Sequence, residues 1–217
     1  MTSQQKEGTL SNIEMPRRMS KLPIDPVWKL PVPWFVAWVD GKPCFPVMDA
    51  RKWHNAVRYK LCWICGQALR DPMAFVIGPM CGINRTSAEP PSHVTCAMYA
   101  AQACPFLTTP KMKRMDVSHL DAVEAPGIAI KRNPGCCAVW ITNRYTVFEA
   151  GNGRLIDIGE PRLVHWYAEG RKATREEVLE SINSGLPSLQ AIATAEGPEA
   201  EAELVKMTKA FERLLPV

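Results

Sequence analysis

Residues 61–104 read LCWICGQALRDPMAFVIGPMCGINRTSAEPPSHVTCAMYAAQAC, and this stretch carries the most specific signals in the chain. Within it, Cys62 and Cys65 are separated by two residues and followed at once by Gly66. The tight turn between such cysteines points both thiolates to one side, and the glycine lets the backbone turn away without a side-chain clash. The spacing is that of a zinc knuckle, so it predicts that the two cysteines bind one metal ion.

A second pair of potential ligands follows after twenty-seven intervening residues. His93 and Cys96 lie three positions apart, directly after Pro90-Pro91-Ser92, where a helical pattern begins. Positions i and i+3 of a helix share a face, so both side chains can reach the same ion. Four nitrogen and sulfur ligands fit a closed tetrahedral site, and the sequence therefore predicts one structural zinc held by four residues: Cys62, Cys65, His93 and Cys96.

Eight cysteines also admit other interpretations, namely buried free thiols, redox thiols or disulfides. Disulfides are disfavoured because the first fifteen residues show no secretory signal and the chain is much longer than small disulfide-stapled domains. Cys81 lies within the same stretch and is an alternative to His93 as the fourth ligand. Cys104 lies about 12 Å along the helix from Cys96, which is too far to share the ion. The remaining cysteines, Cys44, Cys136 and Cys137, have no paired ligand nearby.

The residues between the two ligand pairs support the zinc interpretation. Residues 73–77 (MAFVI) form a strand-like apolar run, and Gly78-Pro79 and Cys81-Gly82 are typical of turns. A knuckle, a hairpin and a helix in this order resemble a treble-clef zinc module with a CCHC ligand set. The chain also resembles bacterial and prophage proteins that carry a CWxCG, FVIGPMC, EPPSH and CPFL series. That resemblance implies the zinc site and no particular activity.

Composition places the chain among ordinary globular proteins. It has 217 residues, 47% of them hydrophobic, and a net charge of +4 with a pI near 8.6. A mild positive charge suggests nucleic acid as a partner without requiring it. The longest apolar run, residues 32–39, is too short to span a bilayer. We therefore expect a soluble, cytoplasmic protein without a membrane partner.

The predicted fold class is α+β: antiparallel strands, a treble-clef-like zinc module and a C-terminal helical segment. Residues 1–22 are polar and predict a disordered tail. Residues 23–135 are expected to hold a hairpin, a helix, the zinc module and a long basic connection. Residues 136–217 are expected to hold a β-meander and helices, and the last two parts can form one continuous domain.

Local signals place individual elements. Asp40-Gly41 predicts a tight hairpin turn between strands at 34–39 and 42–48, and Asp49 predicts the cap of a helix reaching about Lys60. Residues 137–149 predict one strand, followed by strands at 155–158 and 163–167 in a meander. Further along, Thr174 and Glu177 predict a capping box, and Gly185 with Pro187 predicts the end of that helix. Ser188 and Pro198 are expected to open two more helical segments.

Two classes of function remain. The first is a zinc-stabilised binding protein with a nucleic-acid or protein partner, and the alternative is a metal-dependent nuclease of the treble-clef type. The binding protein is favoured because the only histidine of the module is already a predicted zinc ligand. The predicted partner-binding residues are two in the module and five in the long basic connection: Asn84, Arg85, Lys111, Lys113, Arg114, Lys131 and Arg132.

Overall fold

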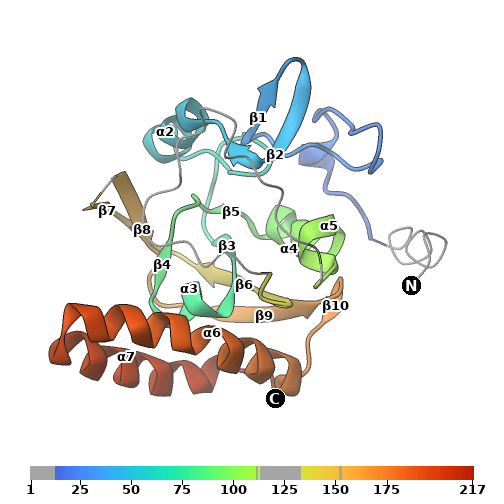
Figure 1. Ribbon diagram of the computed structural model, residues 1–217. Helices are drawn as coiled ribbons and strands as arrows, with labels where there is room; N and C mark the ends of the chain where they lie inside the picture. Colours follow the sequence, from blue (N-terminus) through green and yellow to red (C-terminus); the bar gives the residue numbers. More distant parts are fainter. Residues whose placement is uncertain (1–12, 111, 113–132, 152) are drawn as a thin grey trace.

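The computed structural model describes residues 13–110, 112, 133–151 and 153–217. A five-stranded antiparallel sheet lies between helices on its two faces (Figure 1). Its strands, in spatial order, are β10 (Arg171–Lys172), β9 (Leu163–Ala168), β6 (Cys136–Thr142), β3 (Met73–Ile77) and β5 (Ser92–His93). Two smaller sheets accompany it, a hairpin of β1 (Val36–Val39) and β2 (Lys42–Met48), and a three-stranded sheet of β4 (Thr86–Ser87), β8 (Gly153–Asp157) and β7 (Thr146–Ala150).

Helices cover both faces of the five-stranded sheet. On one face lie α3 (Pro79–Ile83), α6 (Arg175–Glu196) and α7 (Pro198–Phe211), and on the other lie α4 (Val94–Ala103) and α5 (Pro105–Thr108). The remaining helical segments are η1 (Arg17–Met19), α2 (Ala50–Tyr59) and η2 (Glu212–Leu214). Within the described ranges, no helix combines the length and the apolar character needed to cross a bilayer. The architecture is a mixed α and β fold with antiparallel sheets and a C-terminal helix pair, in agreement with the predicted class.

Strand β6 is buried along its whole length because it faces a helical layer on each side. Cys136 and Trp140 belong to the core shared with α6 and α7, whereas Cys137 and Val139 belong to the core shared with α4. Successive side chains of a strand point to opposite faces, so the side chains of Cys136 and Cys137 lie on opposite faces of the sheet. Pairing of β6 with β3 joins residues 23–135 and 136–217 in one sheet.

The predicted strand over residues 137–149 is wrong, because two strands occupy this segment. β6 ends at Thr142. The Thr142 hydroxyl lies within hydrogen-bond distance of the carbonyl oxygens of Arg144 and Glu160, and these contacts turn the chain out of the sheet. β7 then pairs with β8 in the three-stranded sheet, while β6 pairs directly with β9. The predicted meander is therefore also incorrect, since the β7–β8 hairpin is inserted between two neighbouring strands of the larger sheet.

The end predicted for α6 at Gly185 is wrong, and no new helix starts at Ser188. The helix continues through Pro187 for 22 residues in all. A proline inside a helix removes one hydrogen bond and costs about 3 kcal/mol. Ile182 and Leu189, on either side of the proline, are both buried in the main core. Burial on both sides therefore favours one continuous helix over a break.

Other local signals give the structure they predict. Asp40 and Gly41 both have positive φ angles, 49° and 74°, as a two-residue hairpin turn requires. The Asp49 carboxylate accepts hydrogen bonds from the N–H groups at the start of α2, as expected of an N-cap. In the capping box, the Glu177 N–H donates to Thr174 Oγ1 and the Thr174 N–H donates to Glu177 Oε2.

The disordered tail predicted over residues 1–22 does not hold for its second half. Residues 1–12 lie outside the described part of the chain, but from residue 13 the chain packs against the zinc-knuckle region. Met19 is buried there, in contact with a cluster that includes Cys62 and Cys96. Gln67 of the knuckle loop also donates a hydrogen bond to the Arg18 carbonyl at 2.9 Å. The apolar residues of this N-terminal segment are too sparse to show a helix or strand period in the sequence. They nevertheless pack against the cluster that contains Cys62 and Cys96.

The buried face of α7 packs on the body of the protein. Phe211 stacks on Trp140 at a centroid distance of 6.5 Å and meets the edge of Trp166 at 5.9 Å. Gly82 of α3 lies beneath the same ring, where a Cβ atom would come within 2.6 Å of it. This aromatic contact fixes the helix pair against the sheet and α3.

We expect Phe211→Ala to lower the free energy of unfolding by about 3–5 kcal/mol, because it leaves a cavity beside two tryptophans. Urea unfolding followed by circular dichroism measures this change. Val205→Ala is the matched control, because Val205 is exposed on the same helix and its loss should cost less than about 0.5 kcal/mol. Equal losses in the two variants would show that the α7 contact is not a principal source of stability.

Candidate metal centre

The first ligand pair lies on a tight loop after α2. The N–H of Gly66 donates to the Cys62 carbonyl at 2.8 Å, and the N–H of Cys62 donates to the Gln67 carbonyl at 2.8 Å. Gly66 has φ of +71°, and a Cβ atom there would come within 2.7 Å of the Trp34 ring. Glycine is therefore required both by the backbone conformation and by the close approach of the tryptophan.

The second ligand pair lies where the edge strand β5 meets α4. His93 is the last residue of β5 and the N-cap of the helix, with an extended backbone, and Cys96 lies in the first helical turn. The helix thus begins at Val94, and His93 lies just outside it. The two ligands converge because the chain turns from strand to helix between them, not because they share a helical face.

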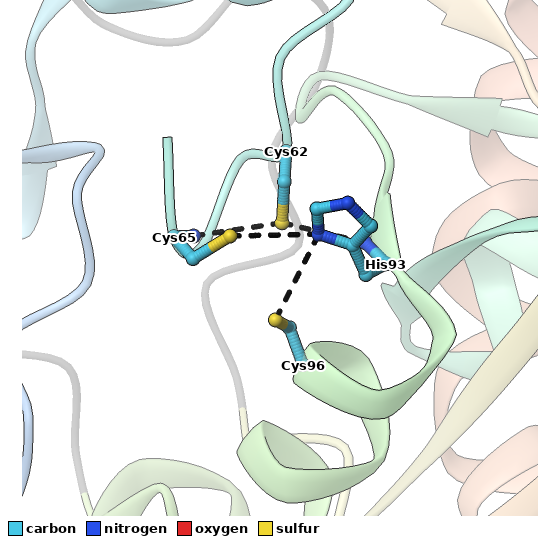
Figure 2. A group of neighbouring side chains, drawn as sticks. All are labelled: Cys62, Cys65, His93 and Cys96. Atoms are coloured by element: carbon cyan, nitrogen blue, oxygen red, sulfur yellow. Dashed lines mark hydrogen bonds between the residues drawn. The ribbon is translucent and has the colours of Figure 1, made fainter. Parts of the chain in front are cut away.

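The four predicted ligands converge in one buried cluster, drawn in Figure 2. Their ligand atoms all lie within 4.8 Å of one another, and none of the four residues is more than 8% exposed. His93 Nδ1 lies 3.4 Å from the sulfur of Cys65 and 4.0 Å from that of Cys96. Zinc bonds of about 2.3 Å to sulfur and about 2.0–2.1 Å to nitrogen imply tetrahedral edges of about 3.5–3.8 Å. The cluster therefore has the donors and the size to hold a metal ion such as zinc.

The orientation of the His93 imidazole keeps Nδ1 available to bind a metal. His93 Nε2 lies 3.0 Å from the Ala68 carbonyl oxygen, which can only accept a hydrogen bond. Nε2 therefore carries the proton, and Nδ1 keeps its lone pair directed at the three sulfur atoms. Metal-binding histidines generally donate their other ring N–H in this way, which fixes both the tautomer and the ring.

Of the three cysteines in the cluster, Cys62 is the one whose surroundings favour the thiolate form. Hydrogen bonds from the Cys65 thiol, and then from the Cys96 thiol, lower the pKa of Cys62. The N–H groups of Cys65 and His93 also point at the Cys62 sulfur, at 3.5 and 3.3 Å. The same contacts with Cys62 raise the pKa values of Cys65 and Cys96. Without a cation one thiolate forms first and opposes the others, whereas a bound divalent ion stabilises all three.

The structure brings His93 into the cluster and leaves Cys81 outside it. Cys81 lies in α3 with a thiol that contacts the main core, and burial raises its pKa to about 11. The other four cysteines also lie outside the cluster: Cys44, Cys104, Cys136 and Cys137.

Asn84 and Arg85, two predicted partner-binding residues, make contacts within the fold. Asn84 ends α3, and its side-chain oxygen accepts the N–H of Thr86. Arg85 has a positive φ of 58°, and its guanidinium lies over the Trp140 ring at 4.7 Å and pairs with Glu160 at 3.1 Å. These contacts order the α3–β4 turn, and a role in partner binding stays a prediction. The five predicted basic residues, Lys111, Lys113, Arg114, Lys131 and Arg132, lie outside the described residues.

The contacts around the ligands were not predicted from the sequence. Trp63, between the two knuckle cysteines, stacks on Phe35 with ring centroids 4.9 Å apart and an interplanar angle of 7°. The N–H of Trp34 donates to the Ile64 carbonyl at 2.7 Å. In the sequence, only the adjacent aromatic residues Trp34 and Phe35, just before β1, hint that aromatic side chains pack on the loop with Cys62 and Cys65. The role of the Ala68 carbonyl has no sequence signal, since any residue supplies that oxygen.

The chain between the ligand pairs does not close a hairpin of its own. β3 pairs with β5 and β6, and β4 pairs with β8. The knuckle and the ligand-bearing helix of a treble clef are present, and that classification stays a prediction. Comparisons with protein-family models, with curated proteins and with solved structures gave no match to this chain.

We expect one zinc ion per chain in protein purified without added metal, and we expect His93→Ala to lose most of it. Cys81→Ser is the matched control and should keep the full metal content, because Cys81 lies outside the cluster. Elemental analysis against protein concentration measures both. Retention of zinc by His93→Ala together with its loss from Cys81→Ser would assign the fourth ligand to Cys81.

Proposed function

We propose that this chain is a zinc-stabilised binding protein, in which the metal is structural and the partner is a nucleic acid or another protein. The observation that supports this proposal is the closed, buried set of four protein ligands. Catalytic zinc sites keep an open position for water or substrate, whereas structural sites are fully coordinated by the protein. An accessory role of bacterial or phage type is part of this proposal.

The metal would stabilise the base of the β1–β2 hairpin. The knuckle residues Trp63 and Ile64 contact Phe35 and Trp34 directly before β1, and Gly66 lies against the Trp34 ring. The N-terminal segment covers the other side of the knuckle through Met19 and its neighbours. Without the metal, three buried thiols and an imidazole would hold these segments together only weakly. Zinc binding therefore contributes to the folding free energy of everything attached to the knuckle.

The nuclease alternative has less support. A metal-dependent nuclease needs an open coordination position and a base to activate water. Both nitrogens of His93 are already engaged, one directed at the sulfur atoms and the other donating to the Ala68 carbonyl. Nothing in the described part of the chain favours this alternative over the binding protein. The basic residues predicted to contact a partner, Lys111, Lys113, Arg114, Lys131 and Arg132, remain part of the proposal.

We expect Cys96→Ser to destabilise the whole chain, because Trp63 of the knuckle belongs to the main core. Each kcal/mol shifts the Tm of a chain of this size by about 2–4 °C, so losing several kcal/mol lowers Tm by about 10 °C or more. Differential scanning calorimetry before and after chelation tests this. Cys44→Ser is the control, since Cys44 lies on the hairpin outside the metal cluster. An unchanged melt in zinc-free protein would contradict a structural role for the metal.

A further inference from the structure

The outer part of the β1–β2 hairpin is apolar, yet it contributes no buried residue. Eight of the eleven residues at 37–47 are apolar, and none of the eleven is buried. Only the base of the hairpin is anchored, by buried Val36 and by Met48, which packs against the main core. A two-stranded hairpin is marginally stable in water, and a contiguous exposed apolar patch marks a surface for interaction.

Two exposed aromatic rings lie on this hairpin, one on each strand. Trp38 pairs with Pro43 across the strands, and Phe45 follows Pro43 by two positions along β2. The pairing of β2 with β1 changes register beyond Cys44, and Phe45 is the first residue of the bulged stretch that follows. The two side chains are 47% and 37% exposed. The hairpin therefore offers two exposed platforms on which planar rings can stack.

Positive charge lies on α2, at the same end of the molecule as the hairpin (Figure 1), with the Asp49 carboxylate 3.7 Å from Arg51. The outward face of α2, the helix after the hairpin, carries four exposed residues at helical spacing: Arg51, His54, Asn55 and Arg58. No acidic residue lies within α2, and exposed Lys42 and Lys60 lie before and after it. Residues 13–60 hold nine Lys and Arg against four Asp and Glu, a net charge of +5.

The charge of the opposite end of the molecule has the reverse sign. Residues 175–214, which form the C-terminal helix pair and η2, hold eight Glu against four Lys and Arg, a net charge of −4. Figure 1 shows the hairpin and α2 at one end of the molecule and the helix pair at the other. A polyanion would therefore be directed to the hairpin end and repelled from the other.

The sequence of β2 decides against recognition by strand addition. Pro43 and Pro46 have no N–H group to donate to an added strand, and prolines are one way in which edge strands are protected from pairing. β1 is only four residues long. The hairpin is thus suited to recognition by its face, through rings, and not by its edge.

We propose that the exposed rings of Trp38 and Phe45 and the cationic face of α2 form a binding site for single-stranded nucleic acid. Bases stack on the two rings, and Arg51 and Arg58 hold the phosphates. Single strands expose the base faces that a duplex buries, and aromatic platforms beside cations are how proteins bind them without reading sequence. This inference rests on the proposed function, because the zinc knuckle supports the base of the hairpin.

The test is fluorescence anisotropy of a labelled oligothymidine of about 20 nucleotides with the zinc-loaded full chain at low salt. Trp38→Ala and Phe45→Ala should each weaken binding by about 5- to 150-fold, since stacking of one base contributes on this scale. The matched control is Phe148→Ala, which removes an exposed ring from β7, in the other hairpin, and should leave affinity unchanged. All variants should keep one zinc per chain and the wild-type Tm.

Salt dependence tests the cationic part of the site. The double variant Arg51→Ala, Arg58→Ala should reduce the slope of log affinity against log salt by about 1.4, because each phosphate contact on a single strand contributes about 0.7. A double variant of the acidic helix pair, Lys206→Ala with Lys209→Ala, is the control and should change the slope little. Equal changes in both double variants would overturn the assignment of the site to α2.

Other outcomes separate this inference from the proposed function. No binding of the oligonucleotide by protein that holds zinc and melts normally would overturn the inference and leave the structural zinc intact. Tighter binding of a duplex of equal length would overturn the stacking mode. Sedimentation tests whether the protein forms a dimer. If Trp38→Ala dissociates a dimer while oligonucleotide affinity stays unchanged, the hairpin surface with Trp38 and Phe45 is a protein interface and the inference is wrong. Loss of zinc at neutral pH without loss of Tm would instead contradict the proposed function.

Discussion

The hydrogen bond from His93 Nε2–H to the Ala68 carbonyl is the constraint on which the metal centre depends. It ties the second ligand pair to the loop that carries the first pair and fixes the tautomer that leaves Nδ1 for the metal. The loop in turn supports Trp34 and Phe35 at the base of the hairpin. One contact between a side chain and a carbonyl therefore connects the edge of the main sheet with the N-terminal third of the chain.

The loop that carries Cys62 and Cys65 and the main sheet form one continuous structure. Trp63 lies between two ligands and also belongs to the core beneath α6 and α7. His93 closes the edge strand β5, so one ligand is held by the sheet itself. A metal ion bound at this position would stabilise the fold as a whole, because its ligands come from both the loop and the sheet.

Signals that act within a few residues could be predicted from the sequence, and those that depend on distant packing could not. The Cys62 and Cys65 spacing, the Asp40-Gly41 turn and the Thr174 capping box are satisfied by neighbouring backbone atoms. The continuation of α6 through Pro187 depends instead on a core assembled from other elements, which outweighs the local preference of proline. The choice of His93 over Cys81 likewise depends on the pairing of β5 with β3 at the sheet edge, which spacing alone does not reveal.

X-ray absorption at the zinc edge, on protein purified without added metal, tests the central claim most directly. The account predicts a four-coordinate ion with three sulfur neighbours at about 2.3 Å and one nitrogen neighbour at about 2.0–2.1 Å. Imidazole scattering from a single histidine should accompany them. A coordination sphere with two sulfur neighbours and bound water, or the absence of a zinc edge, would contradict a closed structural site.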